Sequence, residues 1–355
     1  MTDNDDTGRQ RIVTPQQKRE DEEEYSLALR PKTLEEYDVG QEKLIENLRV
    51  TIEAARQRGD ALEHVLFDGP PGLGKTTLAH IIAHEMESEI HRTSGPALER
   101  ASDLVGILTN LGGGDVLFID EIHRLPRVVE EYLYSAMEDF RIDFVVDKGP
   151  YAKSIPLHLD RFTLVGATTR AGLLTGPLRE RFGIFHHIDF YTPEQLEKIV
   201  RRSARLLEVE LTPDGCSELA ERARGTARIV NRLLRRVRDY AQVKGDGRIT
   251  ADIARDALQA MGVDEMGLDD LDRKYLRALI EYYNGGPAGL NAMAATLGQD
   301  EGTLQDVVEP YLLKIGFVIR TPRGRQVTPR ACQHLGIQIN DEDDIGDPNM
   351  AMDFE

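Results

Sequence analysis

The chain has 355 residues and a formal net charge of −18, with 40% hydrophobic and 30% charged residues. This length exceeds what one hydrophobic core usually organises, and the composition excludes a chain disordered throughout, so we expect two or three domains. No run approaches the ~20 apolar residues of a membrane span. Two cysteines 116 positions apart exclude a disulfide scaffold or a cysteine zinc module. With no apolar segment after the first methionine, this predicts a cytoplasmic protein.

The acidity is concentrated at the two ends. Residues 1–30 carry 8 acidic and 5 basic side chains, and residues 341–355 carry 7 acidic and none basic. Neither end has hydrophobic periodicity, so we predict solvated acidic tails at 1–24 and 337–355, with a solubility role favoured over a docking role. Two inner segments are basic: 201–240 has 10 arginines against 6 acids, and 311–330 has five basic residues and no acid. The net charge therefore does not exclude a nucleic-acid partner.

Residues 25–193 predict a large α/β domain, because helical patterns alternate with short strands that are apolar on both faces, as in a parallel sheet flanked by helices. Between 140 and 159, polar and apolar residues alternate on both sides of Lys148-Gly149-Pro150, which predicts a β-hairpin insertion. The expected helices are 41–58, 75–86 and 128–138, and the expected strands are 64–68, 89–93, 116–120, 161–168 and 185–190.

The remainder predicts two smaller domains. A proline at the first helical turn, Pro193, opens a helical stretch through about residue 261, which indicates a small helical domain at 194–264. Residues 262–267 resemble a linker. Three helical patterns followed by strands at 317–320 and 326–328 then predict a winged helix at 265–336, with Tyr282 and Tyr283 packed in its core.

The first motif that carries chemistry is G-P-P-G-L-G-K-T at 69–76, which matches G-x-x-x-x-G-K-[ST] between an apolar strand and a helix. Gly72 and Gly74 allow backbone amides to curl around phosphate oxygens. Lys75 places a positive charge on the β- and γ-phosphates, and the Thr76 hydroxyl is a ligand for Mg²⁺. This pattern predicts an ATP site.

Two further strands end in polar residues that suit nucleotide hydrolysis. The strand at 116–120 ends in Asp120 and Glu121, which predicts Asp120 near the metal and Glu121 as the group that polarises the attacking water. The strand at 161–168 leads into Thr169, which could orient that water. An acid at Glu121 favours a hydrolase over a nucleotide-binding switch.

The wing of the predicted winged helix is basic, whereas its third helix is not. Arg320, Arg323 and Arg325 fall within six residues, while the third helix, about 302–315, carries Asp306 and Glu309. These two carboxylates would meet a phosphate-rich groove unfavourably. We therefore predict sequence-independent contact between DNA phosphates and the three wing arginines.

One alternative metal site has weak support. His80 and His84 are four residues apart on the helix after the phosphate loop, a spacing that suits zinc. No glutamate follows His80 to give H-E-x-x-H, and no third ligand is evident, so we do not predict zinc here.

Several strings of residues together resemble the AAA+ ATPases: the loop at 69–76, F-I-D-E-I-H at 118–123, G-A-T-T-R at 166–170 and R-F-G at 181–183. Within that class, G-T-A-R-I-V-N-R-L-L-R-R-V-R-D at 225–239 and R-T-P-R-G-R at 320–325 are similar to the RuvB family. These are bacterial motors that drive branch migration of Holliday junctions. The resemblance covers about residues 25–335.

The resemblance implies a role for each matching position, with ATP and Mg²⁺ as cofactors. Leu29 and Arg30 would lie by the adenine, Thr169 would be the sensor, and Arg181 would be an arginine finger that reaches a neighbouring subunit of a homo-hexamer. The hairpin at 140–159 would dock RuvA, and a RuvC-like resolvase would be a further partner. Nucleotide contacts are also implied for Gly72, Gly74, Lys75, Thr76, Thr77, Glu138, Asp139, Phe140, Tyr191 and Arg228, and DNA contacts for Arg320 and Arg325.

The chain departs from the family at two positions. Ala227 replaces a usual proline just before Arg228, and Asp38 replaces a usual apolar residue. Because neither change removes a charged or phosphate-contacting group, we expect them to tune nucleotide affinity and leave activity intact.

The resulting functional prediction is an ATP-driven motor of DNA recombination and repair that translocates duplex DNA at four-way junctions. Two alternatives share the ATPase motifs. A clamp-loader subunit should end in a helical collar and often carries a cysteine zinc module. A DNA-binding initiator or scaffold would use ATP as a switch, which Glu121 and Arg181 argue against.

Overall fold

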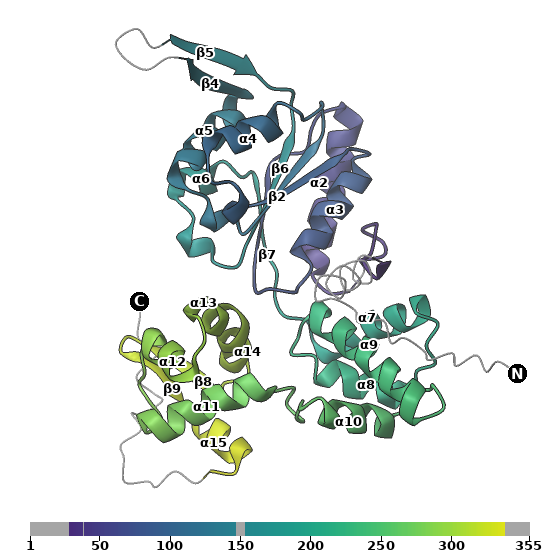
Figure 1. Ribbon diagram of the computed structural model, residues 1–355. Helices are drawn as coiled ribbons and strands as arrows, with labels where there is room; N and C mark the ends of the chain where they lie inside the picture. Colours follow the sequence, from purple (N-terminus) through teal and green to yellow (C-terminus); the bar gives the residue numbers. More distant parts are fainter. Residues whose placement is uncertain (1–27, 38, 147–152, 338–355) are drawn as a thin grey trace, which may run out of the picture. The chain divides into compact units, whose positions relative to one another are not determined.

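The computed structural model describes residues 28–37, 39–146 and 153–337 (Figure 1). The chain divides into two compact units, Met1–Ala257 and Leu258–Glu355. Within the described ranges, no helix combines the length and the apolar character that crossing a membrane requires. Both cysteines, Cys216 and Cys332, are unpaired and buried.

The first unit is built on a five-stranded parallel sheet with the strand order β2-β3-β6-β1-β7. The central strands are buried on both faces, and the edge strands β2 and β7 are partly exposed, which explains why the apolar runs of the centre are the most continuous in the sequence. All five predicted strands form, although their ends shift by up to three residues. The strands are β1 Val65–Asp68, β2 Ile90–Ser94, β3 Val116–Asp120, β6 Thr163–Thr168 and β7 Ile184–His187.

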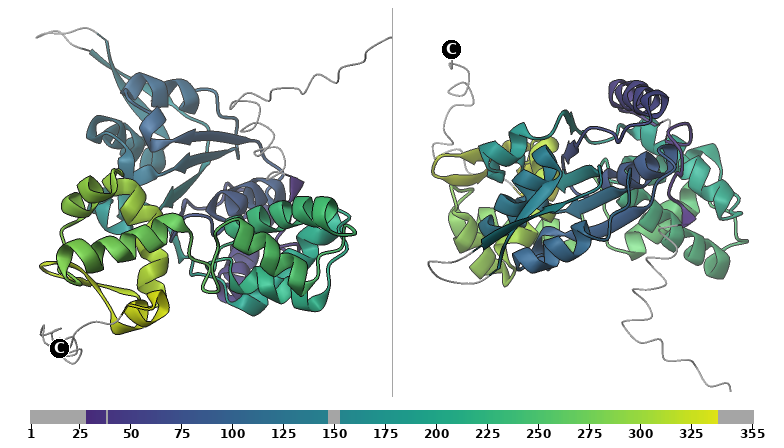
Figure 2. Two further views of the ribbon diagram at one scale, coloured as in Figure 1. Left: turned by 60° about the horizontal axis from the view of Figure 1, so that its bottom comes forward. Right: turned by 90° about the horizontal axis from the view of Figure 1, so that it is seen from above.

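Helices cover both faces of this sheet, with α2 and α3 to one side and α4, α5 and α6 to the other (Figures 1 and 2). The predicted helices α2, α3 and α5 form within one residue of the expected bounds. The helices α4 and α6 were not predicted, because eight and five residues are too few for a helical period to stand out. The elements are α2 Glu42–Arg58, α3 Lys75–Glu85, α4 Ala101–Leu108, α5 Arg127–Asp139 and α6 Gly176–Glu180, with 3-10 turns η1 Gly95–Ala97, η2 Ile122–Arg124 and η3 Ala171–Leu173.

The predicted β-hairpin forms, with β4 Arg141–Val146 antiparallel to β5 Lys153–His158. It is a separate two-stranded sheet that projects from the large sheet and does not extend it (Figure 1). Phe140 adopts a left-handed conformation (φ 50°) at the end of α5, which turns the chain into the hairpin. The Phe140 ring packs edge-on against Phe162 at 5.8 Å and anchors the base of the hairpin. The hairpin tip lies outside the described residues.

The stretch after the sheet is helical, as predicted, and consists of α7 Pro193–Leu206, α8 Pro213–Glu221, α9 Ala227–Lys244 and α10 Ala251–Ala260. A threonine caps the N-terminus of the first three, because the hydroxyls of Thr192, Thr212 and Thr226 each accept a hydrogen bond from a backbone N–H three residues later. Pro193 and Pro213 stand at the first helical position, where the missing N–H has no partner to lose.

The second unit is a winged helix, as predicted. Its core joins buried residues of three main helices, of the short helix after the wing and of two strands, including Tyr275, Leu312 and Val318. The third helix is interrupted by a π-helical turn, and a further short helix follows the wing; neither was predicted. The elements are α11 Asp270–Tyr283, α12 Leu290–Leu297, α13 Glu301–Thr303, the π-helical η4 Leu304–Val308, α14 Glu309–Lys314, β8 Val318–Thr321, β9 Gly324–Val327 and α15 Pro329–Leu335.

Residues 262–267, predicted as a linker, contain no helix or strand and are held by hydrogen bonds: the Asp264 carboxylate accepts the N–H groups of Met266 (3.0 Å) and Leu268 (2.8 Å) and lies 2.9 Å from His334. One expectation about this unit was wrong. Tyr282 does not pack in the core, since it is 70% exposed. Tyr283 does pack there, and its hydroxyl lies 2.7 Å from that of Thr296.

Candidate nucleotide site and basic wing

The phosphate loop, residues 69–74, connects β1 to α3 and depends on its glycines. Gly72 and Gly74 have φ values of 81° and 105°, a region that side chains disfavour. A Cβ at Gly74 would lie 2.9 Å from the Tyr37 hydroxyl. The loop therefore brings its backbone amides and the N-terminus of α3 together in one concave turn, which fits the phosphates of a nucleotide.

Lys75, the first residue of α3, is 7% exposed. Its ammonium group donates hydrogen bonds to the carbonyls of Gly69 (2.6 Å) and Pro70 (2.9 Å). Burial lowers the pKa of Lys75, whereas the nearby charges of Asp120, Glu121 and Asp68 favour its charged form. The cation is thus held inside the phosphate loop and close to the carboxylates at the end of β3.

Asp120 and Glu121 occupy the end of β3, as predicted. The Asp120 carboxylate accepts the Glu121 N–H at 2.9 Å, and Glu121 adopts a left-handed conformation (φ 49°). Thr76, which follows Lys75 on α3, offers a hydroxyl. A hydroxyl and a carboxylate are hard oxygen donors, so the chemistry of Thr76 and Asp120 fits Mg²⁺.

Thr169 follows β6, which lies next to β3 in the sheet. Its hydroxyl is buried and has no hydrogen-bond partner within the described part of the chain. Buried polar atoms are nearly always paired, so such an atom beside a nucleotide site is suited to a ligand. This agrees with the sensor role that the resemblance implies.

His123 is a residue of this site that the sequence analysis missed. Its side chain is 4% exposed, and its Nε2 lies 3.4 Å from the Glu121 carboxylate. Its Nδ1 lies 2.9 Å from the hydroxyl of Thr168, at the end of β6. His123 therefore joins the predicted catalytic acid to the strand that carries the sensor. Its place two residues after Glu121, at the end of the string F-I-D-E-I-H, was the signal that could have found it.

Two buried tyrosines border the phosphate loop: Tyr37, in the segment at 28–37, and Tyr191, just before α7. The Tyr191 hydroxyl donates to the Leu73 carbonyl at 2.8 Å, and the Tyr37 hydroxyl lies 2.8 Å from that of Tyr191 and 3.3 Å from the same carbonyl. Burial raises the pKa of both tyrosines, so they stay neutral donors. Leu29 is buried, and its carbonyl accepts a hydrogen bond from Arg202 of α7 at 2.8 Å.

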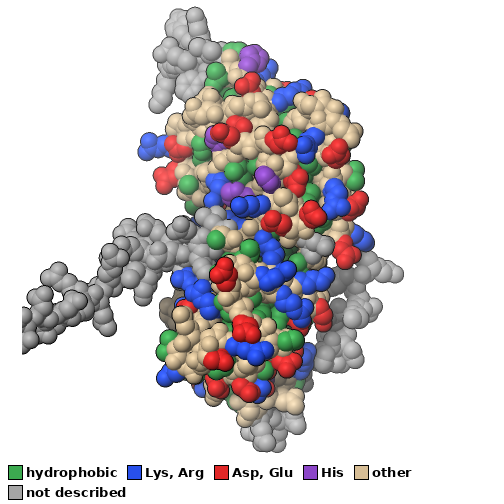
Figure 3. Space-filling model, turned by 90° about the vertical axis from the view of Figure 1, so that its right-hand side faces the viewer, with side chains coloured by type: hydrophobic (Ala, Val, Ile, Leu, Met, Phe, Trp, Pro, Cys, Tyr) green, Lys and Arg blue, Asp and Glu red, His purple; other side chains and the backbone are tan. Residues whose placement is uncertain are grey.

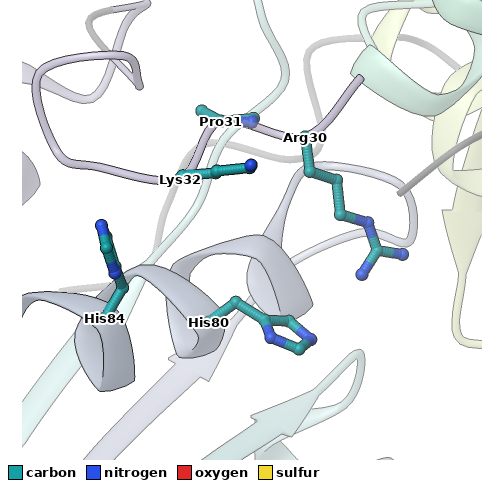
Figure 4. Close-up of a pocket in the computed structure, with 5 residues that line it drawn as sticks. All are labelled: Arg30, Pro31, Lys32, His80 and His84. Carbon is teal, nitrogen blue, oxygen red and sulfur yellow. The ribbon is translucent and has the colours of Figure 1, made fainter. Parts of the chain in front are cut away.

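A pocket of about 280 Å³ lies beside α3 and is lined by Arg30, Pro31, Lys32, His80 and His84 (Figure 4). Burial, together with the charges of Arg92 and Arg30, lowers the pKa of His80. Cationic side chains around the two histidines oppose binding of a metal cation. The pocket places Arg30 next to the helix that follows the phosphate loop, as expected for an adenine-side residue.

The start of α9 contacts the phosphate loop, because the Arg228 N–H donates to the Gly72 carbonyl at 3.2 Å. The Arg228 side chain itself is exposed. Ala227 is the first residue of α9, so the loss of a family proline removes a rigid φ but does not break the helix start. The other departure, Asp38, lies outside the described residues.

Arg181 contacts α5 and α6 and not the phosphate loop of its own chain. Its guanidinium donates to the Glu138 carboxylate and to the Pro177 carbonyl, both at 2.7 Å, and lies 4.9 Å from the centre of the Tyr134 ring. The structure thus brings together two residues with an implied role between subunits, Arg181 and Glu138. Their neighbour Phe140 instead packs at the hairpin base, and Asp139 lies 3.8 Å from Arg141.

Many arginines of the basic segment 201–240 are paired with acids. Arg201 lies 2.6 Å from Glu197, and Arg222 lies 2.9 Å from Glu218, each one helical turn apart. Lys and Arg side chains lie close to Asp and Glu on the face shown in Figure 3. Ion pairs therefore offset part of the positive charge of this segment.

The wing, residues 318–327, carries the three predicted DNA-binding arginines, but two of them bind a buried acid. Glu309 is fully buried and lies 2.6 Å from Arg320 and 2.8 Å from Arg325. The expectation that Glu309 would face the DNA groove is therefore wrong, since the wing folds over it. The exposed fraction is 44% for the Arg320 side chain and 17% for that of Arg325, and Arg323 is exposed.

The phosphate loop, the carboxylates at the end of β3, the buried threonine after β6 and the adjoining helical domain define an AAA+ P-loop ATPase that also carries a winged helix. Three descriptions of known families match the chain in order: the Holliday junction DNA helicase RuvB P-loop domain at 29–188, the RuvB AAA lid domain at 191–264 and the RuvB C-terminal winged helix domain at 265–336. The chain belongs to the RuvB family.

Relatives and solved structures agree with this assignment. The Holliday junction branch migration complex subunit RuvB of Chloroflexus aurantiacus is 54% identical over 97% of this chain and 99% of its own length. The subunit of the same name from Salinibacter ruber is 59% identical over 86% and 89%. A structure of the Thermotoga maritima RuvB Holliday junction branch migration motor aligns with a TM-score of 0.82 and 52% identity over 88% of this chain and 100% of that one.

Proposed function

We propose that the chain is the ATP-hydrolysing motor subunit of a Holliday junction branch migration complex. The observation that carries the proposal is the set Lys75, Asp120, Glu121 and Thr169, which surrounds one phosphate loop in a chain that also ends in a winged helix. The names of its relatives support the same function. A winged helix in place of a helical collar disfavours the clamp-loader alternative.

The residues of the site divide the work of hydrolysis. Backbone amides of residues 72–77 and the Lys75 ammonium hold the phosphates, and Leu29, Arg30 and the pocket beside α3 hold the adenosine end. Thr76 and Asp120 would hold Mg²⁺, which would supply positive charge beside the phosphates. Glu121 accepts the proton of the attacking water, and Thr169 orients that water.

Completion of the site requires a second subunit. The contacts of Arg181 are with α5 and α6 and not with the phosphate loop, so we propose that it stabilises the transition state in a neighbour's site, with Glu138 and Asp139 also near that interface. This requirement makes oligomerisation part of the mechanism, and the family resemblance favours a homo-hexamer. Contact between the start of α9 and Gly72, and between Tyr191 and Leu73, couples the lid helices to the nucleotide.

The wing and the β-hairpin are the proposed contact sites for DNA and for a partner protein. Arg320 and Arg323 contact phosphates of duplex DNA without reading sequence. The hairpin formed by β4 and β5 docks a RuvA-like junction-binding protein, and a RuvC-like resolvase acts on the same junction. The two buried, unpaired cysteines of the chain suit the cytoplasm.

A strand-dissociation assay on a synthetic four-way junction tests the proposal. We expect ATP-dependent conversion of the junction to duplexes when the junction-binding partner is present, and none with Glu121→Gln. ATP turnover without junction conversion would favour a clamp-loader role, and DNA binding without turnover would favour an initiator or scaffold.

A further inference from the structure

The winged helix contains a buried acid that two wing arginines share. The Glu309 carboxylate accepts hydrogen bonds from Arg320 through Nε (3.0 Å) and Nη2 (2.6 Å), and from Arg325 through Nε (2.8 Å) and Nη2 (3.3 Å). The hydroxyl of buried Tyr275, on α11, donates to it at 3.0 Å. We call these four residues the Glu309 cluster. Every carboxylate oxygen in it has a partner, so the buried charge is satisfied.

The backbone of the third helix is adapted to place Glu309. A π-helical turn, Leu304–Val308, ends immediately before it, and Pro310 follows it. Pro310 has no N–H to donate to the Asp306 carbonyl, which agrees with a widened turn at this point. π-helical turns are rare and occur frequently at functional sites. The π-helical turn therefore lies directly before Glu309, the residue that binds the two wing arginines.

The cluster fixes the orientation of Arg320 without covering it. A guanidinium carries five N–H donors, and Arg320 uses only its Nε and Nη2 edge on Glu309. Its side chain is 44% exposed, and its hydrogen bonds to Glu309 do not use Nη1. An arginine held on one edge by a carboxylate loses less side-chain entropy when its other edge binds a phosphate.

We propose that Glu309 is a positioning residue for DNA binding, which orients the guanidinium of Arg320 toward the phosphate backbone with the help of Arg325 and Tyr275. This inference rests on the proposed function, in which the wing contacts DNA. It divides the three wing arginines by role: Arg320 and Arg323 bind phosphate, and Arg325 mainly supports the cluster.

Removing the charge of Glu309 distinguishes positioning of Arg320 from a simple effect of net charge on DNA affinity. Glu309→Gln makes the wing more positive by one charge, so electrostatics alone predicts tighter DNA binding. Positioning predicts the opposite, because the two guanidinium groups lose the carboxylate that holds them and repel each other. The sign of the change in affinity is therefore the test.

The experiment measures binding of the full chain to a fluorescent duplex by anisotropy over a series of salt concentrations. We expect Glu309→Gln to weaken binding roughly tenfold, as for the loss of one hydrogen-bonded contact to a charged group. The matched control is Glu301→Gln, which makes the same charge change at an exposed position outside the cluster. It should bind as tightly as the unaltered chain or more tightly.

Two further variants keep the outcomes distinct. Arg320→Ala should weaken binding and lower the log–log salt slope by about one. If it does so while Glu309→Gln binds as tightly as the unaltered chain or more tightly, wing contact stands and positioning is overturned. If Arg320→Ala and Arg323→Ala both leave affinity and slope unchanged, the wing contact itself fails. If Glu309→Gln does not fold, Tyr275→Phe decides: it keeps every charge, so weaker binding supports positioning and unchanged binding overturns it.

Discussion

Glu121 has a left-handed backbone conformation that costs a residue with a side chain about 1–2 kcal/mol. The surrounding structure holds it there. The Glu121 carbonyl sits so close to Gly95 of η1 that a Cβ at Gly95 would collide with it, and its N–H bonds to Asp120 at 2.9 Å. The backbone of Glu121 is thus held in a strained conformation at the end of β3, which is common at functional sites and agrees with the proposed role of Glu121 as general base.

Replacing this acid tests the assignment directly. Glu121→Gln removes the proton acceptor but keeps the size of the side chain, so ATP binding should persist while turnover falls at least ~100-fold. Single-turnover hydrolysis and nucleotide binding, measured side by side, check this. Near-normal hydrolysis would place the base elsewhere.

His123 should matter almost as much, through Glu121. His123→Leu removes the hydrogen bond to the Thr168 hydroxyl and the polar contact with the Glu121 carboxylate at 3.4 Å, and the loss of a polar interaction with a charged group corresponds to about 10- to 100-fold in rate. We expect kcat to fall by that factor with little change in ATP affinity. His123→Gln, which retains a donor and an acceptor, should recover part of the rate. Equal rates for the two variants would show that only the volume of the side chain matters.

At the scale of elements, the sequence predicted the strands and the site residues that follow them. Buried parallel strands are apolar on both faces and their carboxyl ends meet at one edge, so strand pattern alone is enough to place Asp120 and Thr169 together. The Glu309 cluster could not be predicted, because its members contact across 11 and 16 residues through tertiary folding, and no local period reports such pairs. The same holds for the contact between His123 and Thr168, 45 residues apart.

His64 shows how one side chain ties elements together. Its Nδ1 accepts the Leu164 N–H of β6 at 2.9 Å, so its Nε2 carries the proton and donates to the Met137 carbonyl of α5 at 3.1 Å. This arrangement requires the neutral ring, and burial lowers the pKa of His64 below its ordinary value of 6.5. As the pH falls below 6.5, the unfolded chain therefore takes up a proton before the folded one does, and stability decreases.

A pH series on a His64 variant checks this dependence. His64→Gln retains one donor and one acceptor but no titrating group, so it should cost about 1 kcal/mol of stability at about pH 8 and lose less on going to about pH 5.5 than the unaltered chain. Urea unfolding of the sheet domain at both pH values measures the difference. Some dependence will persist, because burial also lowers the pKa values of His80 and His186. An unchanged loss on acidification would contradict the role of His64.

At the scale of the whole molecule, negative and positive charge are concentrated in different segments of the chain. The net charge of −18 includes the strongly acidic tail at 341–355, whereas the wing carries three arginines within six residues. The single negative charge of Glu309 offsets one of the two positive charges of Arg320 and Arg325. We therefore expect weak DNA binding by the chain alone, and recruitment to the junction by its partner protein.

The proposed cooperation between subunits also belongs to the scale of the whole molecule, and mixed assemblies test it. Arg181→Ala subunits keep an intact phosphate loop, and Lys75→Ala subunits keep an intact finger, so each alone should be at least ~10³-fold less active than the unaltered chain. In an equal mixture, about one interface in four joins an intact loop to an intact finger, and part of the ATPase activity should return. Arg181→Ala mixed with the double variant Arg181→Ala/Lys75→Ala contains no finger and should stay inactive. An inactive first mixture, with co-assembly confirmed by native mass spectrometry, would show that Arg181 does not act across the interface.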